Sequence, residues 1–403
     1  MFSVLAVSGY RSLRDVVLPL GRLTVVTGAN GTGKSSLYRS MRLLADCGQG
    51  RVIGSLAREG GLSSALWAGP ESLAGARRTG GSVQGTTRAG PVSLRLGVAG
   101  SDVGYLVDLG IPQQGDTAFN RDPEIKRELA WSGPVQRRGT VCARRAWSRV
   151  DLRAEDGTFE RAPLALTTDR SMLTEVADPV VTPELWALRR SLASWRFYDG
   201  FRVDLDAPVR RPQVGTRTRV LADDGADLAA ALQTIAEDGR SPLHEAVADA
   251  FEGARLHITA QDGVFDAGLH QPGMLRPLRT AELSDGTLRY LLWVAALLTV
   301  EPPPLMVLNE PETSLHPSLL APLARLIHEA AQRTQLVVVT HSDELVDRLA
   351  AASDNDGGDD DDEPTTDGEP PAVRRVRLVK DLGETRVAGQ GLLTTPTWEW
   401  GRR

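Results

Sequence analysis

The sequence predicts a mixed α/β fold, in which a mixed or parallel central sheet is accompanied by an antiparallel β lobe and an inserted helical segment. Helical and strand patterns alternate through residues 287–350, as they do in open parallel sheets. Short runs of alternating apolar and polar residues, separated by Gly, Pro and Asp, fill residues 92–159 and indicate an antiparallel meander. At the start of the chain, a β-rich stretch leads into a glycine-rich turn and then into helical spacing.

The first 50 residues predict three strands and one helix. Apolar and β-branched residues favour strands at 3–7, 16–20 and 23–27. After the glycine-rich turn, apolar residues recur at helical spacing, so we expect a helix from about Lys34 to about Gly48.

Helices and strands also follow one another through the rest of the chain. Helical spacing occurs at 183–195, 226–236, 243–251, 287–299, 318–332 and 343–350. Strand patterns occur at 256–259, 264–265, 305–308 and 336–339, and a terminal hairpin is expected from 373–379 and 384–388.

These elements divide the chain into five predicted parts. The parts are the first half of a head at 1–165, an inserted helical and strand segment at 166–280, the second half of the head at 281–350, a linker at 351–372 and the terminal hairpin at 373–403. The linker is acidic, because residues 354–369 carry nine carboxylates and no Lys or Arg, against a net charge of -6 for the whole chain. Like charges mixed with Gly, Pro and Thr do not collapse, so we expect disorder there, with an acidic partner-binding tail as the alternative.

The composition is that of a globular protein, with 403 residues of which 41% are apolar. No charged leader with a cleavage site opens the chain, and the longest apolar run, at 288–300, is too short to cross a bilayer as a helix. Cys47 and Cys142 are the only cysteines, which fits a reducing compartment and excludes a disulfide framework. We therefore expect a cytoplasmic protein without a membrane role.

A glycine-rich segment carries the strongest functional pattern. It reads Gly28-Ala29-Asn30-Gly31-Thr32-Gly33-Lys34-Ser35 and lies between a predicted strand and a predicted helix, which is the context of a phosphate-binding loop. The glycines let backbone N–H groups converge on phosphates at a helix start. Lys34 is one of three lysines among 46 basic residues. We assign Lys34 to the outer phosphates, the Ser35 hydroxyl to Mg²⁺ and Ser36 to a further nucleotide contact.

A second anion site is predicted at Leu283-Ser284-Asp285-Gly286-Thr287, where a serine and a glycine amide open a helix. This segment resembles the LSGGQ signature of ABC ATPases. In that family, the signature of one subunit closes over the ATP held by the phosphate loop of the other subunit. The resemblance therefore implies a homodimer with two shared ATP sites, with Ser284, Asp285 and Gly286 at the nucleotide. An ordinary helix cap is the alternative.

The strand predicted at 305–308 is followed by Asn309-Glu310-Pro311-Glu312, which resembles the Walker B strand and D-loop. In the family pattern the strand ends in Asp-Glu: the Asp holds Mg²⁺ through its water shell, and the Glu polarises the attacking water. Glu310 takes the second role. Asn309 replaces the Asp, and its amide does not offset the charge of the metal. We expect slow ATP hydrolysis, with ATP binding almost without turnover as the alternative.

His341 follows the last strand of the predicted sheet, 31 residues after Glu310. ABC ATPases place the switch histidine, which contacts the γ-phosphate, at this point. The resemblance therefore assigns His341 to catalysis beside Glu310, and a structural histidine is the alternative. His316 is expected to be structural or a dimer contact.

Three stretches together resemble the predicted AAA family ATPases of the RecF, OLD and SMC-like group. They are residues 7–13 (Val-Ser-Gly-Tyr-Arg-Ser-Leu), the Asn-Gly-Thr-Gly-Lys-Ser loop and the Asn-Glu-Pro-Glu-Thr-Ser-Leu-His-Pro strand end. In OLD nucleases a TOPRIM domain follows the ATPase, and the roughly 50 residues after position 350 are too few for one. The likeness thus covers the ATPase part alone, with the cofactors ATP and Mg²⁺.

The expected partner is nucleic acid, because relatives in this group act in DNA repair or in defence against phage. The arginine clusters that would contact phosphates are Arg77-Arg78, Arg137-Arg138, Arg144-Arg145-Arg149 and Arg210-Arg211 to Arg219. Solvated loops in an arginine-rich composition are the alternative for each cluster. The competing function is an ATP-gated switch that recruits a protein effector and does not contact nucleic acid.

Overall fold

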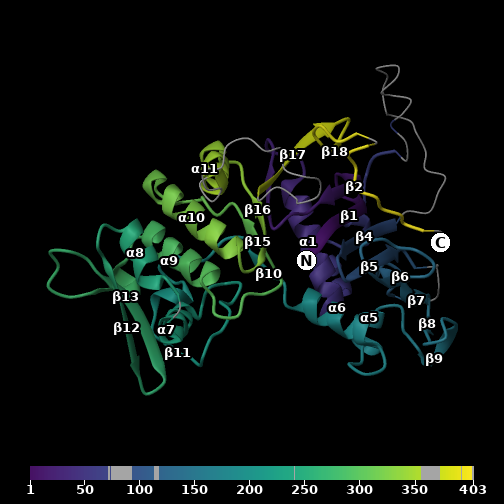
Figure 1. Ribbon diagram of the computed structural model, residues 1–403, viewed down its shortest axis with the longest axis horizontal. Coiled ribbons are helices and arrows are strands. Elements are labelled where there is room, and N and C mark those ends of the chain that lie inside the picture. The colour runs from purple at the N-terminus through teal and green to yellow at the C-terminus, as the bar shows by residue number, and fades with distance from the viewer. Residues whose placement is uncertain are drawn as a thin grey trace, which may run out of the picture. The chain divides into compact units, whose positions relative to one another are not determined.

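The computed structural model describes residues 1–70, 73, 93–112, 118–239, 241–354, 373–391 and 393–401 (Figure 1). They form two compact units. Unit 1 comprises Met1–Leu20, Thr27–Trp195 and Val376–Arg403, and unit 2 comprises Gly21–Val26 and Arg196–Arg375. Within the described ranges, no helix combines the length and apolar character that a membrane span requires. The five-part division drawn from the sequence stays a prediction, because these units are defined by packing and not by function.

Unit 1 is built on an eight-stranded antiparallel sheet. Its order is β2-β1-β4-β5-β6-β7-β8-β9, and every neighbouring pair is antiparallel. The strands are β1 (Phe2–Tyr10), β2 (Leu13–Pro19), β4 (Ser93–Gly100), β5 (Val103–Gly110), β6 (Glu124–Ser132), β7 (Val141–Ala146), β8 (Arg149–Arg153) and β9 (Phe159–Ala165). The predicted antiparallel lobe is therefore confirmed, and it extends further than expected because β1 and β2 continue the same sheet.

Two helices of unit 1 pack against each other beside this sheet. They are α1 (Lys34–Gly48) and α6 (Pro183–Ala193), and α6 also contacts β5 and β6. The approach is close at Gly48, where an added Cβ would lie 2.9 Å from the Cβ of Leu192. The shorter helices of this unit are α2 (Val52–Arg58), α3 (Leu62–Ala65) and α5 (Met172–Glu175). The packing fixes α1, and with it the loop that precedes it in sequence.

Unit 2 contains a parallel sheet in the order β10-β15-β16-β3. Its strands are β10 (Arg196–Tyr198), β15 (Leu305–Asn309), β16 (Gln335–Val339) and β3 (Leu23–Thr27). Helices α7 (Leu228–Asp238), α8 (Leu243–Ala250), α9 (Asp285–Leu297) and α10 (Leu320–Ala331) share one buried apolar core with these strands (Figure 1). The predicted parallel arrangement is confirmed. Only β10 was not expected, because three residues at a sheet edge are too few to give a periodic signal.

Four helices of unit 2 differ from the predicted bounds by two residues or more. Helix α7 begins and ends two residues later than expected. Helix α9 begins at Asp285, two residues early, because the Ser284 side chain caps it. Before α10, a 3₁₀ turn over Pro317–Leu319 replaces the expected first turn. Helix α11 (Asp343–Asp354) runs four residues into the predicted acidic linker, since the alanines there favour helix. The rest of that linker, at 355–372, lies outside the described residues.

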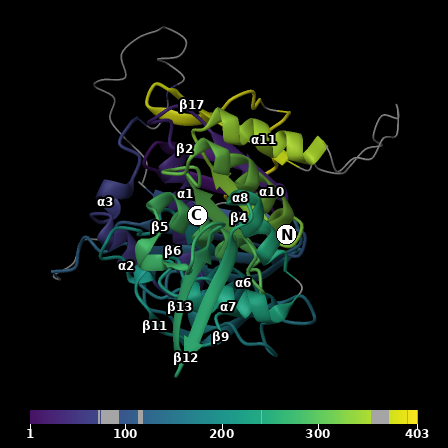
Figure 2. The same cartoon turned by 90° about the vertical axis from the view of Figure 1, so that its left-hand side faces the viewer.

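The remaining elements form a small sheet and a hairpin. The small sheet of unit 2 pairs β13 (Val264–His270) with β11 (Gln213–Val214), β12 (Arg255–Gln261) and β14 (Leu278–Arg279). Figure 2 shows β12 and β13 as a long hairpin. At the end of the chain, β17 (Val373–Asp381) and β18 (Glu384–Val387) form an antiparallel hairpin. Most of this hairpin belongs to unit 1, where it matters for the glycine-rich loop.

Candidate functional site

The glycine-rich loop of unit 1 adopts a backbone that requires glycine. Gly28, Gly31 and Gly33 have φ angles of 155°, 78° and 105°, values that residues with a Cβ rarely adopt. Two of these glycines also have no room for a side chain. A Cβ on Gly28 would lie 2.6 Å from the Leu378 carbonyl oxygen, and a Cβ on Gly33 would lie 2.2 Å from the Thr385 Oγ1. The loop is therefore fixed both by its own conformation and by the residues packed around it.

Lys34 lies at the end of this loop and at the start of helix α1. Its Nζ donates to the carbonyl oxygens of Gly28 at 2.5 Å and of Ala29 at 3.3 Å, so the ammonium group lies against the loop backbone. No side chain caps the N-terminus of α1, which leaves its first amide groups available for an anion. Ser35 and Asn30 are exposed, and Ser36 is half-buried. These groups fit a phosphate chain, with backbone donors and a compact cation in one short segment.

The terminal hairpin supports the loop, a role that the sequence did not indicate. The Thr385 hydroxyl donates to the Thr32 carbonyl oxygen at 2.7 Å and is 2.8 Å from the Ser12 Oγ. The Thr385 amide also donates to the Ser12 carbonyl oxygen at 2.7 Å. Thr385 and Thr32 are 353 positions apart, so no local pattern could have paired them.

Three strands of unit 2 end together at one edge of the parallel sheet. The register pairs Asn309 of β15 with Val339 of β16, and Val339 with Val26 of β3. Because the strands are parallel neighbours, the chain leaves all three at the same edge. β15 leads into Glu310, β16 leads into Thr340 and His341, and β3 leads at its last residue into the glycine-rich loop. Three of the predicted site segments therefore start where these strands end.

Glu310 and His341 lie close together at this edge. The His341 Nδ1 is 3.6 Å from the Glu310 Oε1, and both side chains are about half exposed. Glu310 has a φ of 49°, a strained value for a residue with a side chain, of the kind that clusters at functional sites. Its amide still donates to the Val339 carbonyl oxygen at 2.7 Å, which continues the ladder and holds the strained residue in place.

Glu312 completes this group, and sequence reasoning gave it no role. Its Oε1 accepts from the Thr340 hydroxyl at 2.6 Å and from the His341 amide at 3.2 Å, and it is 3.4 Å from the His341 Nδ1. The side chain is 8% exposed, and Oε2 has no hydrogen-bond partner within the described part of the chain. Glu312 thus fixes the segment that carries His341. Its place two residues after Glu310 was the only available signal.

The predicted signature segment opens helix α9 as expected. The Ser284 side chain accepts from the Thr287 amide at 3.2 Å, and both Ser284 and Asp285 are exposed. A Cβ on Gly286 would lie 3.3 Å from the Ser314 carbonyl oxygen, so the start of α9 lies close to the turn after β15. His316 in that turn caps the following 3₁₀ helix by accepting from the Ser318 amide.

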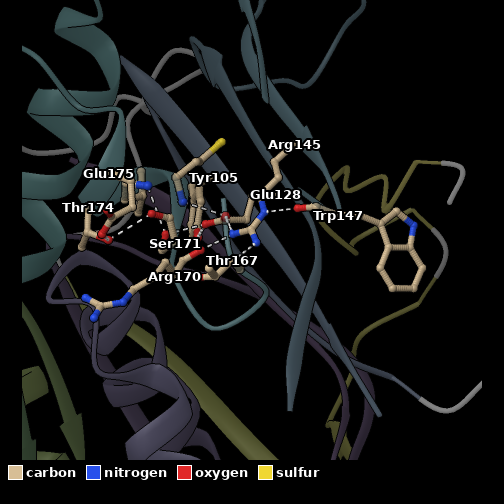
Figure 3. A network of polar contacts seen from close by, with 11 residues as sticks. Tyr105, Glu128, Arg145, Trp147, Thr167, Arg170, Ser171, Thr174 and Glu175 are labelled. Atoms are coloured by element: carbon tan, nitrogen blue, oxygen red, sulfur yellow. Dashed lines mark hydrogen bonds and ion pairs between the residues drawn. The ribbon is translucent and has the colours of Figure 1, made fainter. Parts of the chain in front are cut away.

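Most of the described arginines proposed for nucleic acid contact are buried or form ion pairs within the protein. Arg145 is fully buried, and Glu128, also fully buried, accepts from it at 2.8 Å. Figure 3 shows this pair beside Tyr105 and Ser171, whose hydroxyls also donate to Glu128. Arg210 is 6% exposed. The expectation that Arg145 and Arg210 contact nucleic acid was therefore wrong, because packing hides both guanidinium groups.

The other predicted arginines are exposed, paired or undescribed. Arg144 and Arg149 both pair with Asp151. Burial by itself would raise the pKa of Asp151, but hydrogen bonds from Arg149 and then from Arg144 outweigh it, so the pKa is lowered. Arg211 pairs with Asp206 and Arg219 with Glu301, whereas Arg137 and Arg138 are exposed. Residues 77 and 78 lie outside the described residues.

The donor types suit Mg²⁺ bound together with a nucleotide. Ser35 offers a hydroxyl and Asn309 an amide oxygen, and hard oxygen donors are what Mg²⁺ prefers. Among the described residues, no group of three or more His, Cys, Asp or Glu forms a metal cluster.

Comparisons with known proteins agree with this description. Residues 23–347 match the model of a family described as "AAA domain, putative AbiEii toxin, Type IV TA system". The crystal structure of an SMC head bound to the C-winged helix domain of ScpA is similar, with a TM-score of 0.50 and 14% identity over 97% of this chain and 98% of that chain. No curated protein shows significant sequence similarity.

Two further SMC heads match at lower scores. The head domain from Thermotoga maritima has a TM-score of 0.48 and 12% identity, over 97% of this chain and 99% of that one. The Smc head with an extended coiled coil, bound to the C-terminal domain of ScpA from Pyrococcus furiosus, has a TM-score of 0.48 and 12% identity, over 96% and 95%. The similarity at a TM-score of 0.50 concerns the fold alone, and it confirms the predicted α/β fold class.

Proposed function

Because this chain belongs to the AAA-domain family described as "AAA domain, putative AbiEii toxin, Type IV TA system", we propose that it binds ATP with Mg²⁺, hydrolyses it slowly and dimerises around two ATP molecules. The observation that carries the proposal is the common edge at which β15, β16 and β3 end. Ligands of open α/β sheets bind at the carboxyl ends of parallel strands. Glu310, His341 and the start of the glycine-rich loop all follow strands that end there.

Each residue has a role that its surroundings support. Lys34 and the first amides of α1 would bind the outer phosphates, and Ser35 and Asn309 would hold Mg²⁺ with a hydroxyl oxygen and an amide oxygen. Glu310 accepts a proton from the attacking water. His341, whose Nδ1 side faces Glu310 and Glu312, presents its other ring nitrogen to the γ-phosphate. Bound Mg²⁺ supplies charge neutralisation on the phosphates.

Glu310→Gln tests both hydrolysis and dimerisation. The amide keeps the shape but cannot take up the proton, so ATP should persist and hold two subunits together. We expect a dimer with ATP and Mg²⁺, and a monomer without nucleotide, in size-exclusion chromatography with light scattering. Glu329→Gln, an exposed glutamate on α10, is the matched control and should behave as wild type. A variant that stays monomeric with ATP would contradict the shared-site proposal.

Asn309→Asp tests the departure from the family pattern. A carboxylate offsets the charge of the metal, which an amide does not. We expect half-maximal ATPase activity at a Mg²⁺ concentration roughly tenfold lower, with turnover equal or higher. If the Mg²⁺ dependence is unchanged, another residue supplies that charge, and the buried Glu312 is the first candidate.

The partner of the ATPase is proposed to be nucleic acid, in DNA repair or phage defence. The reference to a toxin in the family description agrees better with defence. The exposed Arg137 and Arg138 support nucleic acid contact. The burial of Arg145 and Arg210 favours the second candidate, an ATP-gated switch that recruits a protein effector.

ATPase rates with and without DNA, at low and high salt, separate the two candidates. Stimulation by DNA that salt removes would support nucleic acid, because phosphate contacts are lost as salt rises. An unchanged rate, together with no retention of DNA at low salt, would support the protein effector.

A further inference from the structure

Arg210 lies buried beneath the signature segment of unit 2. It ends the 3₁₀ helix Pro208–Arg210, and its side chain is 6% exposed. Its Nε donates to the Val203 carbonyl oxygen at 2.8 Å. Its Nη1 donates to the carbonyl oxygens of Leu283 at 2.9 Å, Thr280 at 3.2 Å and Ala281 at 3.5 Å. Its Nη2 donates to the Asp285 Oδ1.

These bonds hold the chain just before Ser284 from the inside. Thr280 to Leu283 form the approach to helix α9, and three of their carbonyl oxygens accept from one guanidinium group. A planar group with five donors in fixed geometry suits such a task, and a lysine could not bond the same set at once. Ser284 and Asp285 remain exposed on the outer side of the same segment. Arg210 therefore sets the backbone of the segment without occupying its surface.

The contact between Arg210 and Asp285 also balances the negative charge of the Asp285 carboxylate. Asp285 stands where the family signature has glycine, and its side chain is 65% exposed. A carboxylate in the first turn stabilises a helix, but it would repel a triphosphate that approaches the same helix end. Arg210 places a positive charge directly on this carboxylate from the buried side, so that the segment as a whole meets the nucleotide without net negative charge.

We propose that Arg210 is a positioning residue of the signature segment and the counter-charge that makes Asp285 compatible with the ATP held by a second copy of this chain. The inference rests on the proposed function, because it assumes that the segment closes over that ATP. It assigns Arg210 to dimer closure and not to the glycine-rich loop, which binds nucleotide in its own subunit.

The test measures dimerisation and nucleotide binding separately, in the full chain carrying Glu310→Gln. Arg210→Met removes the charge at similar volume. Asp285→Asn removes the opposing charge, and a third protein carries both changes. Arg211→Met is the control, because this neighbouring arginine is exposed and pairs with Asp206. Dimer dissociation constants with ATP come from sedimentation velocity, and ATP affinity at concentrations that keep the protein monomeric comes from fluorescent ATP-analogue titration.

With Arg210→Met we expect dimerisation about tenfold weaker or more, with analogue affinity of the monomer within about twofold of the parent. The double variant should recover part of the loss, because the unpaired carboxylate is then gone while the backbone carbonyl oxygens still lack the Arg210 donors. Arg211→Met should match the parent. Dimerisation of Arg210→Met equal to that of the parent overturns the inference. A double variant as weak as the single one overturns the counter-charge role, since Arg210 would then act only through its hydrogen bonds to the backbone carbonyl oxygens.

Asp285→Asn alone covers the case in which Arg210→Met does not fold. It changes an exposed side chain, and it should tighten the dimer several-fold at low salt, a gain that high salt removes. Weaker dimerisation of this variant at low salt would overturn the counter-charge. If the parent itself does not dimerise with ATP, the proposed function fails and the inference falls with it. A dimerising parent with no effect of either variant refutes the inference alone.

Discussion

The two units each contain a loop suited to phosphate and a buried arginine, but they use the arginine differently. In unit 1, the glycine-rich loop is held by uncharged groups, chiefly the Thr385 hydroxyl, and Lys34 is its only cation. The buried Arg145 of that unit bonds to Glu128 and to backbone carbonyls of Trp147, Thr167 and Arg170. In unit 2, the buried Arg210 is bonded to the signature segment itself.

This difference separates a charge that stabilises the fold from one that shapes a site. The Arg145–Glu128 pair has no exposed member, so a ligand cannot reach it and its effect is on stability. The Arg210–Asp285 pair has one buried and one exposed member, so it connects the interior to the surface. An ion pair with unequal exposure therefore points to a site more strongly than a pair that is wholly enclosed.

The largest effect is expected at the enclosed pair. Glu128→Gln leaves the Arg145 charge buried without a counter-charge, which should lower the free energy of unfolding by about 3–5 kcal/mol. Urea titration measures the loss, and hydrogen exchange in β6 and β7 assigns it to unit 1. Glu160→Gln, an exposed glutamate on β9, is the control. A loss below about 1 kcal/mol would mean that the Arg145–Glu128 pair does not stabilise the fold more than an exposed ion pair does.

The next effect is expected at the single cation of the glycine-rich loop. Lys34→Ala removes a charged donor from the phosphates, so ATP affinity should fall by about 100-fold in calorimetry. Lys380→Ala, an exposed lysine of the terminal hairpin, should leave the affinity unchanged. Equal affinity of the Lys34 variant would mean that the loop binds phosphate through its backbone alone.

A smaller effect is expected at the uncharged support of that loop. Thr385→Val removes the hydroxyl that bonds to Thr32 and keeps the volume, so ATP affinity should fall by about fivefold, from the loss of one neutral hydrogen bond. Thr395→Val is a matched control, because its hydroxyl also bonds to a backbone carbonyl, that of Gly391, but on the surface. If both variants bind alike, the hairpin does not contribute to the loop.

Much of the fold was predictable because its signals are local. Helical and strand patterns alternate through residues 287–350, and this alternation predicted the parallel sheet. The short runs of alternating apolar and polar residues predicted the antiparallel lobe. Errors occurred where one residue or a very short element decided the outcome. The Ser284 cap moved the start of α9, and the three-residue β10 had too little sequence to give a pattern.

The candidate site was predictable in part for the same reason. Gly28, Gly31 and Gly33 stand within a few positions of Lys34, and φ angles above zero are a property of the residue type. Glu310 and His341 were placed by the strands they follow. Glu312, Thr385 and Arg210 were not assigned, because their roles depend on what folding brings next to them.

The sequence by itself determined the periodic elements and the short motifs, since backbone propensity and spacing act over a few residues. Only the tertiary structure decided which charges are buried and which partners they meet. Arg210 lies 75 positions from Asp285 and Thr385 lies 353 from Thr32. Burial changes the energy of a charge far more than its neighbours in sequence do. The same residue type, arginine, therefore stabilises the fold at position 145 and belongs to a candidate site at position 210.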